Sequence, residues 1–177
     1  MKYRNKLSIL LITLCSAFYT TGTTAEVKLL PESDRMAAPD FVIEKLEGGT
    51  TSLADHKGKL VLLHFWATWC MPCRVEMPGL ESVWQQYKGE GLIILAASVD
   101  EGSKDRVEKY KQIFELSFPI LLDPDSKVND LYKVSNMPTS ILIDGEGQIV
   151  SYVSGTAEWL EPDTVSLIED LLQKKTR

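Results

Sequence analysis

The stretch that decides the fold is LVLLHFWATWCMPCR, residues 60–74. Its first seven residues are almost continuously apolar, which is typical of a strand covered on both faces of a sheet. Cys70 and Cys73 follow in C-x-x-C spacing, and the pattern after them predicts a helix to about residue 87. A thiol at a helix N-terminus lies against unpaired N–H groups and the positive end of the helix dipole, so its thiolate is stabilised. Pro72 falls within the first turn, where a missing N–H is tolerated.

The spacing of the two cysteines favours a redox pair. Cys73 lies one helical turn after Cys70 on the same face, close enough to form a disulfide with it. Zinc is the alternative for an isolated C-x-x-C, but zinc needs two further ligands. Only His56, His64 and Cys15 remain as histidine or cysteine ligands. We therefore predict no metal site.

A longer motif around the cysteines carries a family resemblance. Residues 65–78 read Phe-Trp-Ala-Thr-Trp-Cys-x-Pro-Cys-Arg-x-Glu-x-Pro. This motif resembles the thioredoxin-like proteins of the TlpA/ResA type, which face the bacterial periplasm or the outer cell surface. The resemblance spans roughly residues 37–174. It implies a thiol–disulfide oxidoreductase in which Cys70 attacks a disulfide sulfur and Cys73 resolves the mixed disulfide.

The N-terminus predicts export. Lys2, Arg4 and Lys6 precede an apolar run, and small residues at 23–25 offer a cleavage site, so we interpret residues 1–25 as a signal peptide. The apolar run over 7–18 is shorter than the roughly 20 residues of a membrane span, although an uncleaved anchor stays open.

Cys15 also permits interpretation as a lipoprotein. The large Leu14 before it argues against this, because lipoprotein cleavage favours a small residue at that position. We expect residues 26–38 to form a linker, or an arm lying over the domain. Residues 39–175 then form one thioredoxin-like domain, placed in the periplasm or on the outer face of the cytoplasmic membrane.

The net charge and the number of cysteines limit which molecules this protein is expected to bind and which cysteines can form a disulfide. The chain has a net charge of −6, and its first 25 residues hold three basic groups and no acid, so the remainder carries 16 − 25 = −9. Without a basic run or patch, nucleic acid is a poor partner. After export and cleavage, Cys70 and Cys73 are the cysteines left to pair, in a compartment that permits disulfides.

The order of the predicted elements indicates an α/β fold. Apolar runs and turn signals predict a hairpin around Gly48-Gly49 and further strands at 60–66, 92–99, 119–122, 139–143 and 148–153. Helical spacing predicts helices at 71–87, 103–114, 125–132 and 161–174, the second of them capped by Ser103. We expect a mixed central sheet with helices on both faces. This order fits the thioredoxin fold with an N-terminal β-hairpin and a central βα insertion.

Helical spacing also predicts which side chains face the core. The first helix is expected to bury Val75, Leu80, Val83 and Trp84, and Pro78 should kink it. The second helix is expected to bury Val107, Tyr110, Ile113 and Phe114.

Two ionisable residues are predicted near the cysteines. Glu76 follows Cys73 by three residues on the same face, and the resemblance implies a buried carboxylate that tunes the cysteines and takes the proton of Cys73. The alternative is a solvated carboxylate. His64 stands six positions before Cys70, where thioredoxins carry a buried acid and TlpA/ResA relatives often carry a neutral polar group. It is either a proton acceptor or, as we favour, a neutral core histidine with one hydrogen bond.

Further residues are predicted around the site. Met137, Pro138 and Thr139 resemble the cis-proline loop of the family, which leaves the preceding backbone free to pair with an extended substrate segment. We expect Trp69 at the surface around Cys70. We expect Trp66 in the core and Trp84 and Trp159 in structural roles, and we assign Arg74 no role.

The predicted function is reduction of disulfides in partner proteins, such as apocytochrome c or the cysteines of metal sites. The resemblance implies a membrane electron donor that recharges the pair, no cofactor beyond the Cys70–Cys73 disulfide, and a monomer. A thiol peroxidase of the same fold is one alternative, but such enzymes place a threonine three residues before the reactive cysteine, where this chain has Ala67. A non-enzymatic copper carrier is the other, although no additional Met or His ligands lie near the pair in the sequence.

Overall fold

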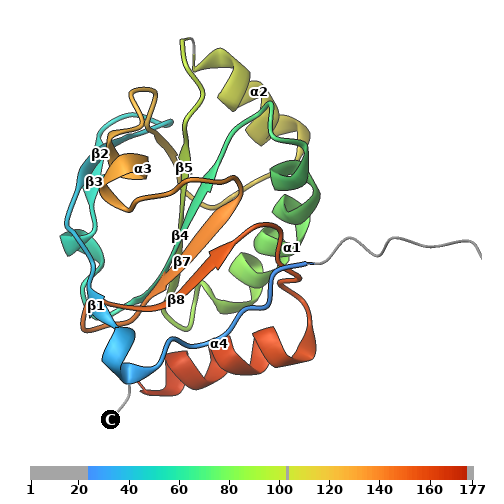
Figure 1. Ribbon diagram of the computed structural model, residues 1–177. Helices are drawn as coiled ribbons and strands as arrows, with labels where there is room; N and C mark the ends of the chain where they lie inside the picture. The colour runs from blue at the N-terminus through green and yellow to red at the C-terminus, as the bar shows by residue number, and fades with distance from the viewer. Residues whose placement is uncertain (1–23, 103, 175–177) are drawn as a thin grey trace, which may run out of the picture.

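The computed structural model describes residues 24–102 and 104–174, which form a mixed sheet with helices on both faces (Figure 1). The sheet has the strand order β1-β8-β7-β4-β5-β6-β2-β3. Its strands are β1 Met36–Ala37, β2 Val42–Lys45, β3 Thr50–Ser52, β4 Leu60–Trp66, β5 Leu92–Ser98, β6 Ile120–Leu122, β7 Thr139–Ile143 and β8 Gln148–Ser154. The helices are α1 Met71–Tyr87, α2 Asp105–Ile113, α3 Lys127–Leu131 and α4 Pro162–Lys174, with single 3-10 turns at Glu32–Asp34 and Ala54–His56.

Strand β4 lies in the middle of this sheet and leads directly into the cysteines. It pairs in parallel with β5 and antiparallel with β7, and β5 pairs in parallel with β6. All seven of its side chains are buried. The predicted thioredoxin-like fold, with its N-terminal hairpin and its central βα insertion, is therefore confirmed. The hairpin β2–β3 turns at Gly48 and Gly49, whose φ values of 94° and 73° need glycine.

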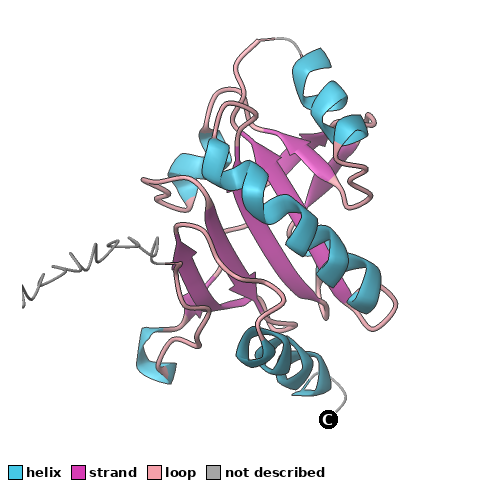
Figure 2. Cartoon of the chain, turned by 90° about the vertical axis from the view of Figure 1, so that its right-hand side faces the viewer, coloured by secondary structure: helices cyan, strands magenta, loops and turns pink. Residues whose placement is uncertain are grey.

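The side chains of β4 alternate between two cores. Leu62 and Trp66 join the core beneath α1, α2 and α4, whereas Leu63 and Phe65 join the core beneath α3 and the hairpin. Figure 2 shows the long helix α1 lying across the strands on the first of these faces. His64 lies between Leu62 and Trp66 at two-residue spacing and therefore on the same face of β4, so its side chain points toward α1 as well.

The N-terminal segment of the described chain lies over the domain as an arm. The N–H of Ala25 donates to the carbonyl of Thr156 at 2.7 Å, and the N–H of Leu30 donates to the carbonyl of Val150 at 2.8 Å. Val27 is buried, and β1 covers the outer edge of β8. Of the predicted signal peptide, residues 1–23 lie outside the described residues.

Two predicted core residues instead face solvent. Val75 is 68% exposed because Cys73, Glu76 and Met77 set the inner face of α1, and Val75 lies half a turn away from Met77. Ile113 is 63% exposed because α2 ends there and Phe114 folds back to stack on Tyr110.

The other predicted positions on these helices keep to the core side. Leu80, Val83, Val107 and Tyr110 are buried, whereas Trp84 and Phe114 are only partly buried. The predicted cap Ser103 lies outside the described residues, and α2 follows Lys104 without a side-chain cap.

Several predicted elements were too wide, since Val99 lies outside β5, Pro119 lies outside β6, and both α2 and α3 are shorter than expected. Pro78 does lie inside α1. Within residues 24–102 and 104–174, no helix is both long enough and apolar enough to cross a membrane.

Candidate active site

The two cysteines form a disulfide at the N-terminus of α1. Their Cα atoms are 5.3 Å apart, and Cys70 occupies the N-cap position. The Sγ of Cys70 accepts a hydrogen bond from the N–H of Cys73 at 3.2 Å. A thiolate at Cys70 would therefore sit against the unpaired N–H groups of the first turn, which lowers the pKa of a cysteine. Cys70 is 5% exposed and Cys73 is fully buried.

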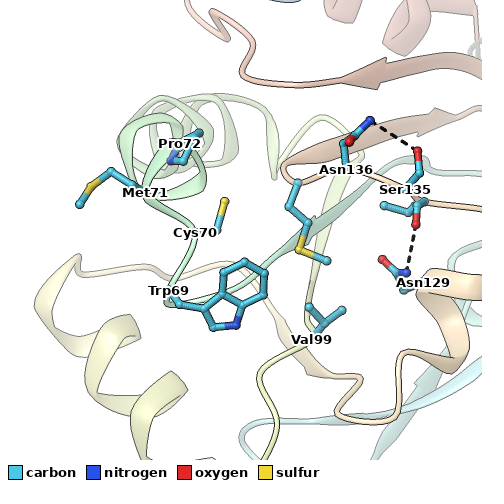
Figure 3. Close-up of a pocket in the computed structure, with 10 residues that line it drawn as sticks. Trp69, Cys70, Met71, Pro72, Val99, Asn129, Ser135 and Asn136 are labelled. Atoms are coloured by element: carbon cyan, nitrogen blue, oxygen red, sulfur yellow. Dashed lines mark hydrogen bonds between the residues drawn. The ribbon is translucent and has the colours of Figure 1, made fainter.

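A groove opens beside Cys70 (Figure 3). It has a volume of about 540 Å³ and runs from the first turn of α1 to the loop before β7. Its lining residues are Trp69, Cys70, Met71, Pro72, Val99, Asn129, Val134, Ser135, Asn136 and Met137. Trp69 and Met71 are 66% and 62% exposed, which confirms that Trp69 lies on the surface around Cys70.

The loop across the groove contains the predicted cis peptide, between Met137 and Pro138. The hydroxyl of Thr139 donates to the carbonyl of Asn136 at 2.8 Å, and the N–H of Gly155 donates to the carbonyl of Pro138 at 2.8 Å. These contacts fix both sides of the loop. Within the described part of the chain, the backbone of Met137 makes no hydrogen bond, and Met137 lines the groove.

A buried carboxylate that the sequence reading missed holds the loop before Cys70. The carboxylate of Asp100 accepts hydrogen bonds from the N–H of Thr68 at 2.8 Å, from the hydroxyl of Thr68 at 2.5 Å and from the hydroxyl of Ser98 at 2.8 Å. Asp100 is 7% exposed and follows the end of β5. A separation of 32 residues between Thr68 and Asp100 gives no local signal for this contact.

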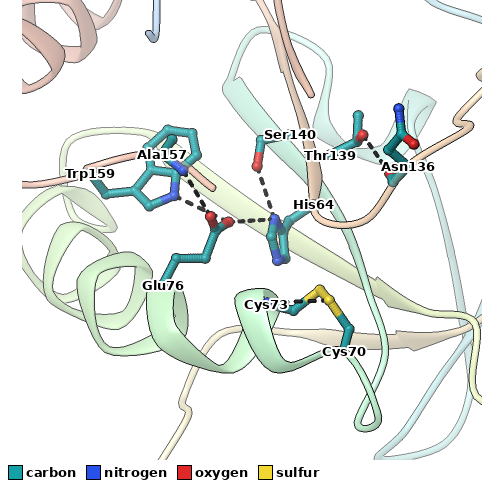
Figure 4. Close-up of polar contacts among 9 residues, drawn as sticks. All are labelled: His64, Cys70, Cys73, Glu76, Asn136, Thr139, Ser140, Ala157 and Trp159. Atoms are coloured by element: carbon teal, nitrogen blue, oxygen red, sulfur yellow. Dashed lines mark hydrogen bonds and ion pairs between the residues drawn. A yellow bond between two sulfur atoms is a disulfide. The ribbon is translucent and has the colours of Figure 1, made fainter. Parts of the chain in front are cut away.

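Glu76 is buried behind the disulfide, 4% exposed, and is not a solvated carboxylate (Figure 4). Its Oε2 accepts the N–H of Ala157 at 3.0 Å, and its Oε1 accepts the indole N–H of Trp159 at 3.4 Å. Burial raises the pKa of Glu76 to about 7, although these two hydrogen bonds act in the opposite direction. Trp159 is thus buried as predicted, but it also holds Glu76, a role that its sequence position did not reveal.

His64 is fully buried next to Glu76. Its Nδ1 lies 2.9 Å from the hydroxyl of Ser140 and 3.4 Å from Oε1 of Glu76. Burial lowers the pKa of His64 to about 3, so the isolated ring is neutral at physiological pH, as favoured from the sequence. Its second nitrogen, Nε2, is buried without a hydrogen-bond partner among the described residues.

Arg74, to which we assigned no role from the sequence, packs its guanidinium over the rings of Tyr110 in α2 and Phe114 just after it. The Cζ atom lies 5.8 Å from the ring centroids of both Tyr110 and Phe114. Tyr110 in turn contacts Trp66, with ring centroids 5.0 Å apart. The inserted helix α2 is therefore tied to the first turn of α1.

Comparison with known proteins decides the family. The model of the AhpC/TSA family matches residues 35–152. The chain is 38% identical to the thiol-disulfide oxidoreductase ResA of Bacillus subtilis over 93% of its own length and 88% of that protein. It belongs to the AhpC/TSA family, among the ResA-type proteins. ResA of Geobacillus kaustophilus is 40% identical over 84% of this chain and 85% of that protein.

Solved structures agree with this membership. The crystal structure of a putative thiol:disulfide interchange protein DsbE from Chlorobium tepidum is 30% identical, with a TM-score of 0.67 over 80% of this chain and 96% of that one. The predicted TlpA/ResA resemblance is confirmed. This ResA-type chain is a thiol–disulfide oxidoreductase with Cys70 and Cys73 as its redox pair.

Proposed function

We propose that this ResA-type enzyme is exported and reduces disulfides in partner proteins. The observation that supports it best is the similarity to ResA proteins over nearly the whole chain, together with a redox pair that opens to an accessible groove. The signal-like residues 1–25 support placement in the periplasm or on the outer face of the cytoplasmic membrane. Solved structures of similar fold include a protein described as secreted, from Corynebacterium glutamicum.

In the proposed reaction, the Cys70 thiolate attacks one sulfur of the partner disulfide, and the other partner sulfur leaves as a thiolate. Cys73 then attacks Cys70, which re-forms the Cys70–Cys73 disulfide and releases the partner reduced. Cys70 lies at the groove and Cys73 is buried, so the order of attack follows from access.

The groove suits an extended protein segment. The N–H and carbonyl of Met137 can pair with the partner backbone as an added strand, while Thr139 and Pro138 hold the loop. Trp69, Met71 and Pro72 supply apolar surface on the opposite side. A segment of apocytochrome c, or of another protein with cysteines at a metal site, is the proposed occupant. The enzyme acts as a monomer and is recharged by a membrane electron donor.

Two alternatives are less well supported. A thiol peroxidase needs the threonine that Ala67 replaces, and Ala67 is fully buried in the core. A copper carrier needs additional ligands, whereas no group of three His, Cys, Asp or Glu side chains gathers as a metal site within the described residues. Peroxide-driven turnover, or stoichiometric copper without disulfide reductase activity, would revive them.

The reduction potential of the Cys70–Cys73 pair tests the direction of electron flow. Tryptophan fluorescence can follow the equilibrium in a dithiol–disulfide buffer, because Trp69 adjoins Cys70 and Trp66 lies in the core below. A reductant should have a potential near or below that of thioredoxin, about −270 mV. A potential near that of a strong oxidant such as DsbA, about −120 mV, would overturn the proposal.

A further inference from the structure

A buried imidazole nitrogen lies beside the redox pair without a hydrogen-bond partner. His64 is fully buried, and among the described residues its Nε2 contacts no donor or acceptor. Burying a polar nitrogen unpaired is costly, so each such atom calls for an explanation, and a catalytic or redox role is one of the recognised ones.

The position of the ring follows from two elements. The side chain of His64 leaves β4 on the face covered by α1, and Cys73 and Glu76 lie three residues apart on the buried face of α1. Glu76 contacts the Nδ1 edge of the ring at 3.4 Å. Figure 4 shows the opposite edge, which carries Nε2, turned toward the disulfide.

The oxygens of Glu76 are engaged elsewhere. Oε2 accepts from Ala157, and Oε1 faces Trp159 and the Nδ1 of His64. Within residues 24–102 and 104–174, no side-chain hydrogen bond joins Glu76 to either cysteine of the disulfide. Direct transfer of the Cys73 proton to Glu76 therefore stays a prediction, and the free nitrogen of His64 offers a second route.

We propose that Nε2 of His64 is the direct proton acceptor for Cys73, and that Glu76 is a positioning residue that acts through Nδ1. With a proton on Nδ1, directed at Glu76 and Ser140, Nε2 carries the free lone pair that a thiol can donate to. The inference rests on thiol–disulfide exchange at this pair and not on the proposed direction of electron flow.

The step balances as follows. In the mixed disulfide, the proton of the Cys73 thiol moves to Nε2. The electron pair of the Cys73 thiolate forms the bond to Cys70, and the bond between Cys70 and the partner sulfur breaks. The partner sulfur leaves with that electron pair and is then protonated. Because burial opposes a charge on His64, its imidazolium is transient and is stabilised by the ionised carboxylate of Glu76 beside Nδ1 until its proton is released. When a donor thiol reduces the pair, the same proton returns from Nε2 to Cys73.

The surroundings limit the groups that can compete. The neighbours of His64 in the sheet are Ala96 on β5 and Ser140 on β7, and neither carries a charge. Besides Glu76 on α1, the charged group that acts on this cluster is Glu158, which follows β8 and raises the pKa of Glu76. Of the ionisable groups in this cluster, His64 is the one whose ring nitrogen Nε2 has no hydrogen-bond partner among the described residues.

Ellman's reagent separates the two steps of the reduced enzyme. The first thionitrobenzoate is released when Cys70 attacks, and the second is released when Cys73 resolves the mixed disulfide. His64→Asn should slow the second phase by roughly 100-fold, the usual contribution of general acid–base catalysis, and leave the first phase unchanged. His56→Asn is the matched control, because His56 contacts Thr51 away from the site and both phases should keep their rates.

The order of action is tested by combining substitutions. Glu76→Gln should slow the second phase in the native background and have no further effect in His64→Asn, because Glu76 acts through the ring. An unchanged second phase in His64→Asn, or an equal effect of Glu76→Gln in both backgrounds, would overturn the proposal.

A measurement on the unaltered enzyme serves if His64→Asn does not fold. In protein labelled with ¹⁵N-histidine, the Nε2 resonance of His64 should change on reduction from a bare nitrogen to one that accepts a hydrogen bond. A resonance identical in both redox states contradicts the proposal. A reduction potential typical of an oxidant would overturn the proposed direction alone.

Discussion

The two sulfur atoms of one disulfide lie in opposite surroundings. Cys70 borders a groove flanked by Trp69 and Met71, both more than half exposed. Cys73 is fully buried and backed by a carboxylate and an imidazole, neither of which reaches solvent. The two cysteines are three positions apart in the sequence, so these two environments lie within one turn of helix.

The difference between the two cysteines indicates that the surface side and the buried side of the site have separate roles in the reaction. The N-terminus of α1 reaches the surface at Cys70, and the turn of the helix then directs Cys73 and Glu76 inward. Attack and recognition belong to the outer side, where a partner can approach. Proton handling belongs to the inner side, where water does not compete for the proton.

The largest expected effect comes from exchanging the two cysteines for serine. Cys70→Ser should abolish disulfide reduction, because the accessible nucleophile is lost. In Cys73→Ser, the Cys70 thiolate should still attack the partner disulfide, and the mixed disulfide should accumulate because the resolving thiol is lost. Mass spectrometry after mixing with a disulfide peptide checks both. Equal trapping by the two variants would break the division between the outer and the inner sulfur.

The next effect tests whether the outer side depends on a buried anchor. Asp100→Ala leaves the Thr68 N–H without its partner, so the free energy of unfolding should fall by about 3 kcal/mol. Urea unfolding of the oxidised protein measures the loss. Asp125→Ala is the control, since Asp125 is exposed and pairs with Lys127 on the surface, and its stability should not change. If the free energy of unfolding falls no more in Asp100→Ala than in Asp125→Ala, the loop before Cys70 does not depend on Asp100 for its stability.

The inner side should give a characteristic dependence of stability on pH. Folding raises the pKa of Glu76 from 4.5 to about 7, so the folded protein binds the extra proton and stability falls as pH rises through this window. Folding lowers the pKa of His64 from 6.5 to about 3, so the unfolded chain binds the extra proton and stability rises with pH in that window. Between pH 4.5 and 6.5 the two contributions oppose each other.

Single substitutions should separate these contributions. In Glu76→Gln, the free energy of unfolding should only rise with pH, because the contribution of His64 remains. In His64→Asn it should only fall with pH, because the contribution of Glu76 remains. Each slope should be at most about 1.4 kcal/mol per pH unit, the limit for one proton. Urea midpoints across the pH range measure the slopes, and the double variant should remove both. Slopes of the same sign in the two single variants would contradict opposite shifts of the two groups.

The smallest effect is expected at the rim of the groove. Trp69→Ala should raise the KM for a disulfide peptide several-fold, because Trp69 lines the groove in which the partner is proposed to bind. The free energy of unfolding and the rate of the resolving step should not change, because Trp69 is largely exposed. Val75→Ala is the matched control, since Val75 is equally exposed and lies outside the groove lining. Slower resolution in Trp69→Ala would show that the two sides are coupled.

The parts of the site that could be predicted were those with a local pattern. The C-x-x-C motif at a strand-to-helix junction identified the pair, and the Met-Pro-Thr sequence at 137–139 marked the loop opposite. Helical spacing put Glu76 on the face of Cys73, but it also put Val75 in the core, where apolar character alone was misleading. Helical spacing does not predict that a carboxylate takes the inner position, because the two donors that satisfy Glu76, the backbone N–H of Ala157 and the indole N–H of Trp159, are 81 and 83 residues away.

The order of strands and helices, the fold and the redox pair could all be read from the amino-acid sequence, because these depend on periodicity and on contacts within a turn or two. The tertiary structure alone decided which distant groups meet at the pair. Ser140 contacts His64 from the neighbouring strand β7, Asp100 holds Thr68 from the end of β5, and Ala157 and Trp159 hold Glu76 from beyond β8. The physical reason is that a buried polar group must be satisfied by whatever the packed sheet brings beside it, and chain spacing carries no record of that neighbour.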